Sequence, residues 1–464
     1  MAMTAVNPAT GEEIERFETL TGEQAQEKLS FADETFREYR STTFAERARM
    51  MERAAEILED EAEELGRIAT QEMGKTFVAA KAEVQKCARG CRFYAENAER
   101  LLADEPVEME GADARIRYQP VGAILAIMPW NFPFWQVFRH AAPGLMAGNV
   151  ILLKHASNVP RVALAIEGVL RRAGFPEGAF QTLLIGSSQI ETLINDPRVR
   201  GVTLTGSEGA GRTVGSQAGR AIKKSVLELG GSDPFVVMPS ADLDAALDAA
   251  VTSRMLNNGQ SCINAKRFVV HERVYEEFER RFVEKVEALK IGDPMDEDTD
   301  MGPLAMQGIL EDVEDQVQQT VAAGARVLTG GERPEMAGNY YRPTVLVDVP
   351  RGTPARDDEI FGPVASLFRV SSLDEAISVA NDTPFGLGAS VWTTDPAERE
   401  RFIDEIESGM LYVNRLVEST PEVPFGGVKN SGYGRELSHF GIQEFTNAKT
   451  VWVEGGGSGE SAVE

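Results

Sequence analysis

Cysteine and histidine are scarce in this sequence. The 464 residues include three cysteines and four histidines. A sparse, odd number of cysteines does not suit a disulfide framework and favours a reducing compartment. The histidines are scattered without the spacing of metal ligands, so no metal site is predicted. Cys87 and Cys91 lie in one helical stretch, and their simplest interpretation is as two small buried side chains.

Long hydrophobic runs and a net positive charge are also missing. No apolar run approaches the roughly 20 residues that span a bilayer, and the N-terminus has no basic start followed by an apolar stretch. Acidic residues outnumber basic residues by 73 to 47, which gives a formal net charge of −26. This balance disfavours binding to nucleic acid or anionic membranes and suits an acidic cytosolic enzyme or a protein from a high-salt source. We therefore expect a cytoplasmic protein that binds neither nucleic acid nor membrane.

The chain is too long for one hydrophobic core, and its apolar pattern predicts two α/β domains. The first hundred residues look mainly helical, and from about residue 120 short apolar runs alternate with helical stretches. Continuous apolar strands separated by helices are typical of βαβ units with a parallel sheet. The first series has predicted strands at 122–128, 149–154, 182–186 and 202–206, and the second has predicted strands at 234–238, 267–272, 344–349, 366–370 and 387–393. Such doubly wound domains frequently bind nucleotides at the carboxyl ends of their strands.

Two strand-like segments lie outside these series, at 115–122 and 445–454. They could pair with each other or with another subunit. The glycine- and serine-rich end of the chain, 456–464, is predicted to be a flexible tail.

Cys262 is the candidate nucleophile. It lies in the polar loop NNGQSCIN after Gly259, where small residues let the backbone approach a ligand closely. Glu228 is the candidate general base, because the leucines that flank it in LELGG would leave its carboxyl group poorly hydrated and raise its pKa. Each residue taken alone also has an ordinary interpretation, as a structural thiol or as an exposed glutamate at a strand end.

Asn131 is the candidate oxyanion donor. It lies in PWNFPFWQVFR (129–139), where aromatic residues and two prolines would hold its side-chain amide rigidly. A fixed amide donor in a dry pocket is what an oxyanion requires. Otherwise this segment is a proline-ordered turn packed with aromatic side chains.

Together with the rest of the chain, these elements resemble the aldehyde dehydrogenase superfamily almost from end to end. The motifs that carry the resemblance are PWNFP (129–133), LTGS (204–207), LELGG (227–231), GQSC (259–262), GDPMDEDTDMGPL (292–304), EIFGP (359–363) and PFGGVKNSGYGRE (424–436). Each motif is weak alone, whereas seven in the same order are specific. The resemblance implies an aldehyde dehydrogenase-like α/β fold with two doubly wound domains and a small β oligomerisation arm.

The resemblance also implies how the chain is divided. The cofactor-binding domain would comprise 1–112 and 123–228, and the catalytic domain would comprise 229–437. The arm would comprise 113–122 and 438–455 and would build a homodimer or homotetramer.

In the implied mechanism, the Cys262 thiolate attacks the aldehyde carbon, and Asn131 with the backbone N–H of Cys262 holds the oxyanion. Hydride transfer to the nicotinamide leaves a thioester, and a water activated by Glu228 hydrolyses it to the acid. The presence of Glu228 favours hydrolytic oxidation over acyl transfer to coenzyme A or reduction of acyl phosphates.

The resemblance implies an NADP site, with NAD also possible. Lys154 matches a lysine that reaches the adenosine ribose, and Ser157 replaces a glutamate that excludes a 2′-phosphate. A neutral serine beside a lysine favours NADP, and a protonated His155 would add positive charge. The other implied cofactor residues are Gly206, Ser207 and Gly211 beneath the pyrophosphate, Glu359 at the nicotinamide ribose, and Trp130 and Phe361, which line the cleft or belong to an aromatic core.

Succinic semialdehyde is the implied substrate. Arg139 and Ser419 match residues that hold the distal carboxylate in semialdehyde-oxidising relatives, and Trp135 would shape the tunnel. Leu256 stands where some succinate-semialdehyde dehydrogenases carry a second arginine, so glutaric semialdehyde and neutral aldehydes remain open. The alternative role of Arg139 is a surface ion pair.

Two further hypotheses stay open. One is a broad-specificity aldehyde dehydrogenase in which Arg139 is not decisive. The other is a catalytically silent binding or structural protein with this fold, against which the joint presence of Cys262, Glu228, Asn131 and Lys154 argues.

Overall fold

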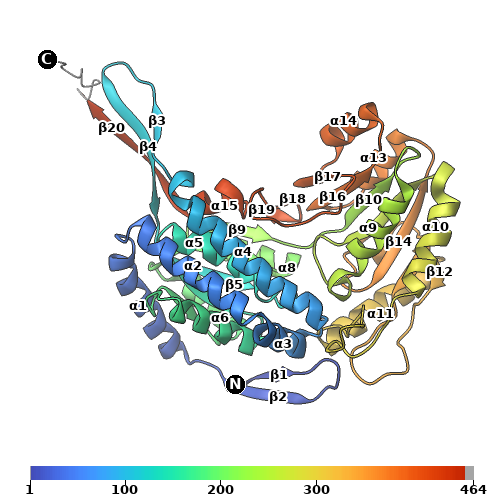
Figure 1. Cartoon of the computed structure of the whole chain (residues 1–464), viewed down its shortest axis with the longest axis horizontal. Helices are drawn as coiled ribbons and strands as arrows, with labels where there is room; N and C mark the ends of the chain where they lie inside the picture. The colour runs from blue at the N-terminus through green and yellow to red at the C-terminus, as the bar shows by residue number, and fades with distance from the viewer. Residues whose placement is uncertain (1, 455–464) are drawn as a thin grey trace.

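Two α/β lobes and a projecting β arm make up the molecule (Figure 1). The computed structural model describes residues 2–454. The first lobe contains a six-stranded sheet in the order β19-β9-β8-β5-β6-β7, parallel except for β19. Its strands are β5 (Ala123–Met128), β6 (Val150–His155), β7 (Phe180–Thr182), β8 (Val199–Thr205), β9 (Lys224–Glu228) and β19 (Gly432–Tyr433).

Helices cover this sheet and supply most of the N-terminal part of the chain. They are α1 (Gly22–Tyr39), α2 (Phe44–Asp60), α3 (Ala62–Met73), α4 (Phe77–Leu101), α5 (Trp135–Met146), α6 (Pro160–Arg172), α7 (Ile190–Asn195) and α8 (Glu208–Arg220). Capping boxes at Thr21 and Thr43 begin α1 and α2, because each threonine side chain accepts a backbone N–H of the first turn. Every residue of α5 is buried, so the helix that follows PWNFP is held from all sides.

The second lobe contains a seven-stranded sheet in the order β12-β13-β14-β11-β10-β16-β17, parallel except for β12. Its strands are β10 (Asp233–Val237), β11 (Ala265–His271), β12 (Arg326–Thr329), β13 (Thr344–Val347), β14 (Val364–Val370), β16 (Gly388–Trp392) and β17 (Met410–Val413). Its helices are α9 (Leu243–Met255), α10 (Glu272–Glu287), α11 (Gln307–Ala322), α12 (Pro354–Asp357), α13 (Leu373–Asn381) and α14 (Pro396–Glu405). The two parallel sheets confirm the predicted fold class.

The arm consists of β3 (Glu105–Val107), β4 (Ala112–Pro120) and β20 (Thr446–Glu454). The sequence predicted two strand-like segments outside the two sheets. These segments pair with each other, since β20 runs antiparallel to β4 along its whole length. The sheet of the arm also contains β3, because Glu105–Val107 pairs with β4. The helix α15 (Ser438–Glu444), which leads into β20, packs on α4 and α5 as well as on β20.

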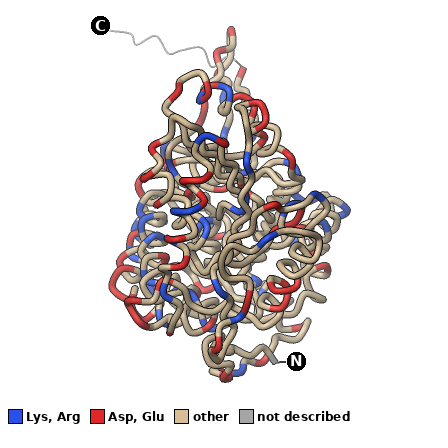
Figure 2. Tube along the Cα trace, turned by 90° about the vertical axis from the view of Figure 1, so that its right-hand side faces the viewer, with Lys and Arg blue, Asp and Glu red and all other residues tan. Residues whose placement is uncertain are grey.

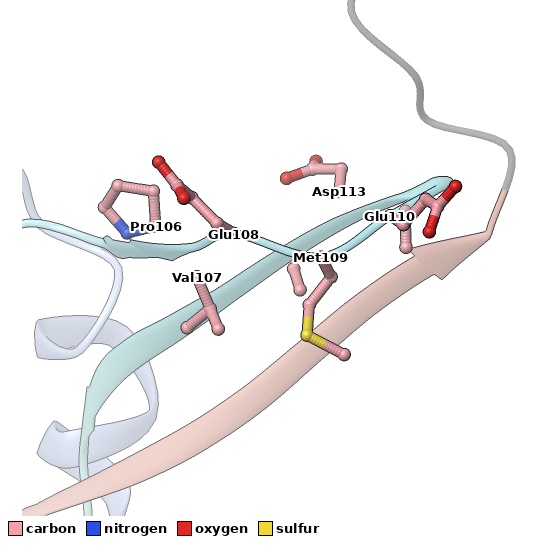
Figure 3. A pocket seen from close by; sticks show the side chains of 8 residues that line it. Pro106, Val107, Glu108, Met109, Glu110 and Asp113 are labelled. Carbon is pink, nitrogen blue, oxygen red and sulfur yellow. The ribbon is translucent and has the colours of Figure 1, made fainter.

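An exposed apolar face distinguishes the arm. Figure 3 shows Val107 and Met109 on one side of the hairpin and the carboxylates of Glu108 and Asp113 on the other. Val107, Met109 and Trp452 are each more than two-fifths exposed, at 43%, 44% and 52%. Large apolar side chains this exposed mark a surface suited to a protein partner.

Smaller differences concern the ends of the chain and one strand. The helical prediction for the N-terminal part missed a hairpin formed by β1 (Ala2–Val6) and β2 (Glu13–Glu18). The strand predicted at 182–186 ends at Thr182 as β7. The predicted flexible tail, 456–464, lies outside the described residues.

Charge is spread over the whole molecule. Figure 2 shows acidic and basic residues interspersed along the trace, without one large basic face in that view. None of the helices within residues 2–454 combines the length and apolar character of a bilayer-spanning segment.

Candidate active site

The loop that carries Cys262 has a fixed backbone. It follows a 3-10 turn, η2 (Leu256–Gly259), and precedes β11. Asn257 and Asn258 have positive φ values of 57° and 58°, a conformation that asparagine tolerates better than most residues. The Asn257 amide donates to the carbonyls of Asn131 and Gln260 at 2.8 and 2.9 Å. The Asn258 amide donates to the Gly74 and Pro303 carbonyls at 3.0 and 2.9 Å.

Gly230 and Gly231 bring the predicted base, nucleophile and ribose-binding segment together. A Cβ atom at Gly230 would clash with the Glu359 carboxylate, and one at Gly231 would lie 2.7 Å from the Cys262 carbonyl oxygen. The Gly231 N–H donates to Glu359 at 3.1 Å. Glycine is therefore required at Gly231, where an added carbon would meet backbone, whereas at Gly230 the Glu359 side chain would have to move.

Among the three cysteines, Cys262 is a partly exposed residue, whereas Cys87 and Cys91 are buried as predicted. Burial raises the pKa of Cys262 to about 12, and the positive charges of Arg139 and Lys266 oppose this shift. The thiol is therefore protonated at neutral pH, and a thiolate nucleophile requires a base.

Glu228 ends β9 and is 1% exposed. Burial raises the pKa of its carboxyl group well above the usual value, and the negative charge of Glu436 adds to the effect. Arg139 and Arg435 act in the opposite direction. Neither carboxylate oxygen of Glu228 has a hydrogen-bond partner within residues 2–454. A buried carboxyl group with a raised pKa and unfilled acceptors is suited to taking a proton.

Asn131 lies in the turn before α5, beside the nucleophile loop. Its side-chain nitrogen donates to the Gln260 carbonyl at 3.2 Å, and the residue is 4% exposed. A primary amide has two N–H donors, so one remains for an oxyanion. The backbone at both ends of this contact is fixed, because Asn257 in turn donates to the Asn131 carbonyl.

Arg139, on α5, is engaged by protein groups. Its guanidinium forms a buried ion pair with Glu436, donates to the Thr205 hydroxyl at 3.3 Å and lies 4.3 Å from the Phe425 ring centroid. The alternative prediction, an ion pair at the surface, was wrong. Arg139 does form an ion pair, but both side chains are buried and at most 4% exposed. Arg139 also lines the cavity above Cys262, but the carboxylate of Glu436 already balances its charge.

A cavity of about 630 Å³ opens above Cys262 and holds the predicted substrate residues. It is bordered by α4, α5, the Cys262 loop and the segment 414–419, and includes Cys262, Arg139, Trp135 and Ser419. In its wall the Trp135 ring N–H donates to the Ser419 hydroxyl at 2.8 Å. Lys86, from α4, donates to the same hydroxyl at 3.0 Å.

The predicted pyrophosphate residues lie at the start of α8. Gly206 follows β8, and Ser207 is the N-cap of α8. The Ser207 hydroxyl accepts the Ala210 N–H at 3.4 Å. A Cβ at Gly211 would lie 2.5 Å from both methyl carbons of Leu229, so glycine lets α8 approach the end of β9. The positive end of the helix dipole faces this edge of the sheet, which suits an anion.

Lys154 and Ser157 lie at the carboxyl edge of the same sheet, at and just beyond the end of β6. Burial lowers the pKa of Lys154, and no carboxylate in the described part of the chain contributes to the shift. Ser157 is exposed. The suggestion that a protonated His155 adds positive charge was wrong. His155 is 4% exposed, one ring nitrogen accepts the Ala156 N–H, the other lies 2.9 Å from the Pro133 carbonyl, and burial lowers its pKa to about 4.

Glu359, Trp130 and Phe361 are the remaining predicted cofactor residues. The Glu359 carboxylate forms an ion pair with Lys266 at 3.1 Å. Trp130 and Phe361 are in edge-to-face contact, with ring centroids 5.7 Å apart. Both rings are only half-buried, which leaves part of each ring free to line a cleft.

Several site residues were missed by the sequence analysis. Lys86 and Lys266 were not singled out, although Lys266 lies only four positions after Cys262. Glu436 is the last residue of the motif PFGGVKNSGYGRE, and no role was predicted for it. The available signal was weak, because Lys86 and Ser419 are separated by 333 positions and meet only in the folded chain.

Comparisons with known proteins agree over nearly the whole chain. The model of the aldehyde dehydrogenase family matches residues 1–451. Succinate-semialdehyde dehydrogenase (NADP(+)) 1 of Mycobacterium tuberculosis is 55% identical over 98% of this chain and 100% of that protein. The Mycobacterium leprae succinate-semialdehyde dehydrogenase (NADP(+)) is 53% identical over the same shares. A crystal structure of succinic semialdehyde dehydrogenase from Streptococcus pyogenes with NADP+ has a TM-score of 0.95 and 36% identity, covering 97% of this chain and 100% of that one. This chain therefore belongs to the aldehyde dehydrogenase family.

Proposed function

We propose that this chain oxidises succinic semialdehyde to succinate and prefers NADP over NAD. The observation that carries the proposal is the cavity that extends from Cys262 to the Ser419 hydroxyl, with cationic side chains at its wall. The relatives named above, at 55% and 36% identity, support the same substrate and cofactor. In the balanced reaction, an aldehyde, water and NADP+ give a carboxylate, NADPH and two protons.

Three residues would perform the chemistry. Glu228 takes the Cys262 proton, and the sulfur then bonds to the aldehyde carbon to form a thiohemiacetal. The free N–H of the Asn131 amide and the backbone N–H of Cys262 hold the oxyanion. Glu228 releases this proton to solvent before the hydrolytic step. After the carbon has lost its hydride, Glu228 removes a proton from the water that attacks the thioester. When the C–S bond breaks, this proton returns to the Cys262 sulfur and the acid is released.

The cofactor would be held by residues from both lobes. Gly206, Ser207 and Gly211 lie where a pyrophosphate meets the start of α8, and Glu359 offers a carboxylate to the nicotinamide ribose. NADP, when bound, supplies the hydride acceptor. The preference over NAD rests on Lys154 and Ser157, because a free ammonium group beside a neutral hydroxyl accommodates a 2′-phosphate that a carboxylate would repel.

The proposal extends to the assembly, the division into domains and the location. The exposed apolar face of the arm supports a homodimer or homotetramer. The two lobes would be the cofactor-binding and catalytic domains of a cytoplasmic enzyme.

A Trp452→Glu variant tests the role of the arm in the assembly. Its mass by size-exclusion chromatography with light scattering should be smaller than that of wild type, and an unchanged mass would show that the arm does not hold the subunits together.

A substrate panel with both cofactors tests the proposal. We expect kcat/KM for succinic semialdehyde to exceed that for butanal, a neutral aldehyde with the same number of carbons, by more than about tenfold. NADP should have a lower KM than NAD. Equal values for the two aldehydes would overturn the substrate assignment.

A broad-specificity aldehyde dehydrogenase is the second candidate, and the ion pair between Arg139 and Glu436 favours it. An arginine whose charge is already balanced holds a substrate carboxylate less strongly. Leu256, which is 42% exposed at the cavity, supplies no second guanidinium. The same substrate panel separates the two candidates.

A further inference from the structure

One helix of the first lobe places a lysine in the cavity. Ala79, Ala82, Glu83 and Lys86 of α4 all line it, and their spacing puts them on one face of the helix. The Lys86 ammonium lies 3.0 Å from the Ser419 hydroxyl oxygen and 4.8 Å from the centroid of the Trp135 ring. Lys86 therefore reaches the part of the cavity wall where Trp135 and Ser419 meet.

The other charged side chains of the cavity wall have partners of opposite charge. Arg139 is paired with Glu436, and Arg415 is paired with Glu418 at 2.7 Å. Glu83 is paired with Lys75 and also accepts the backbone N–H groups of Phe134 and Trp135.

Lys86 differs from these residues because no carboxylate within residues 2–454 forms an ion pair with it. Burial lowers the pKa of Lys86 to about 8, and the charge of Arg139 acts in the same direction. Glu418, Glu83 and Cys87 oppose the shift. At neutral pH most molecules therefore carry an unbalanced positive charge at this point of the cavity.

The hydrogen bonds of Ser419 give a second argument. A serine hydroxyl has two acceptor lone pairs and one donor hydrogen. The Trp135 ring N–H and the Lys86 ammonium fill both acceptor positions, at 2.8 and 3.0 Å. The Ser419 hydrogen must then be donated elsewhere, and the described part of the chain offers it no acceptor. Ser419 and Lys86 thus present two hydrogen-bond donors at one place in the cavity wall, and an anion can accept from both.

We propose that Lys86 and Ser419 together bind the distal carboxylate of the semialdehyde substrate, so that Lys86 is the residue that determines specificity for an anionic substrate. This inference rests on the proposed function. Lys86 supplies the cation that Leu256 does not, and it reaches the site from α4 rather than from the helix and turn that precede Cys262. Arg139 acts mainly on the catalytic carboxyl groups beside it, because its guanidinium is paired with Glu436.

The test compares kcat/KM for succinic semialdehyde and butanal in four proteins: wild type, Lys86→Met, Lys86→Arg and Lys81→Met. Lys81 is a matched control, since it lies on the same helix and pairs with Glu63 at the surface. We expect Lys86→Met to lose about ten- to a hundredfold in kcat/KM on succinic semialdehyde, mostly through KM, with a much smaller loss on butanal. Lys86→Arg should restore most of the selectivity, and Lys81→Met should retain all of it.

Inhibition by the product gives a second measurement that does not depend on turnover of the semialdehyde. With butanal as substrate, succinate should inhibit wild type more strongly than butyrate does, and Lys86→Met should reduce this difference by about tenfold or more. If Lys86→Met does not fold, Lys86→Gln replaces it.

The outcomes separate the two proposals. A wild-type enzyme without preference for succinic semialdehyde would overturn the proposed function. A wild type with that preference, together with a Lys86→Met variant that keeps both the substrate ratio and the inhibition by succinate, would overturn the role of Lys86 alone.

Discussion

The Lys266 ammonium nitrogen lies 2.7 Å from the carbonyl oxygen of Cys262, within hydrogen-bond distance. The same ammonium group forms an ion pair with Glu359 at 3.1 Å. One side chain therefore fixes the nucleophile loop and the carboxylate expected at the nicotinamide ribose. The positive charge of Lys266 also lowers the pKa of the Cys262 thiol, against the larger effect of burial.

Replacing Lys266 with methionine should raise the pKa of Cys262, because the thiolate loses a stabilising positive charge. The alkylation of Cys262 by iodoacetamide, followed by peptide mass spectrometry, should then require a higher pH than in wild type. Lys285→Met is the control, since Lys285 pairs with Asp248 at the surface. An alkylation profile identical in the Lys266 variant and wild type would contradict the assignment.

Replacing Arg139 with methionine should move the acid limb of the kcat profile to higher pH. The guanidinium lowers the pKa values of Glu228 and Glu436, so its loss raises both, and Glu228 stays protonated over a wider range. The variant should also lose about 3–5 kcal/mol of unfolding free energy near pH 8, because Glu436 becomes a buried charge without a partner.

A double variant, Arg139→Met with Glu436→Gln, distinguishes these effects. It removes the unpaired charge, so urea unfolding should show part of the stability recovered. No recovery would mean that packing of Arg139 against Phe425, rather than its ion pair, carries the stability.

The parallel sheets were predictable, whereas several contacts of the site were not. Strands such as β5 and β10 are buried on both faces and therefore appear as continuous apolar runs in the sequence. The β1–β2 hairpin was missed because most of the side chains of β2 are exposed and charged. Lys86 lies in an amphipathic helix, where a lysine normally indicates a solvent-exposed face. The ion pair of Arg139 with Glu436 joins residues far apart in the chain, which no local pattern reveals.

Replacing Ser157 with glutamate should reverse the cofactor preference. A carboxylate near Lys154 would balance its charge and repel a 2′-phosphate while accepting the ribose hydroxyls of NAD. We expect the ratio of kcat/KM for NADP to that for NAD to fall by more than about tenfold. Ser157→Gln is the neutral control of similar size, and a ratio that stays constant in the glutamate variant would show that Ser157 does not contact the cofactor.

Replacing Gly211 with alanine should destabilise the protein by about 1–3 kcal/mol and raise KM for NADP. The added methyl group would meet Leu229 at 2.5 Å and push the start of α8 away from β9. Gly219→Ala on the same helix is the control, because a Cβ there meets nothing within 4 Å. That variant should be neutral or slightly more stable in urea unfolding. Equal effects at the two positions would contradict the close approach of α8 to Leu229.

The fixed backbone of the Cys262 loop also affects how fast the protein deamidates. Asn258 precedes Gly259, a sequence that deamidates readily where the chain is mobile, because the glycine N–H attacks the asparagine side chain. Here that side chain is 2% exposed and bonded at both ends, to Gly74, Pro303 and Gly302. Deamidation therefore requires the loop to open. The rate at which Asn258 is converted to aspartate in stored protein thus reports how often the nucleophile loop leaves its active geometry.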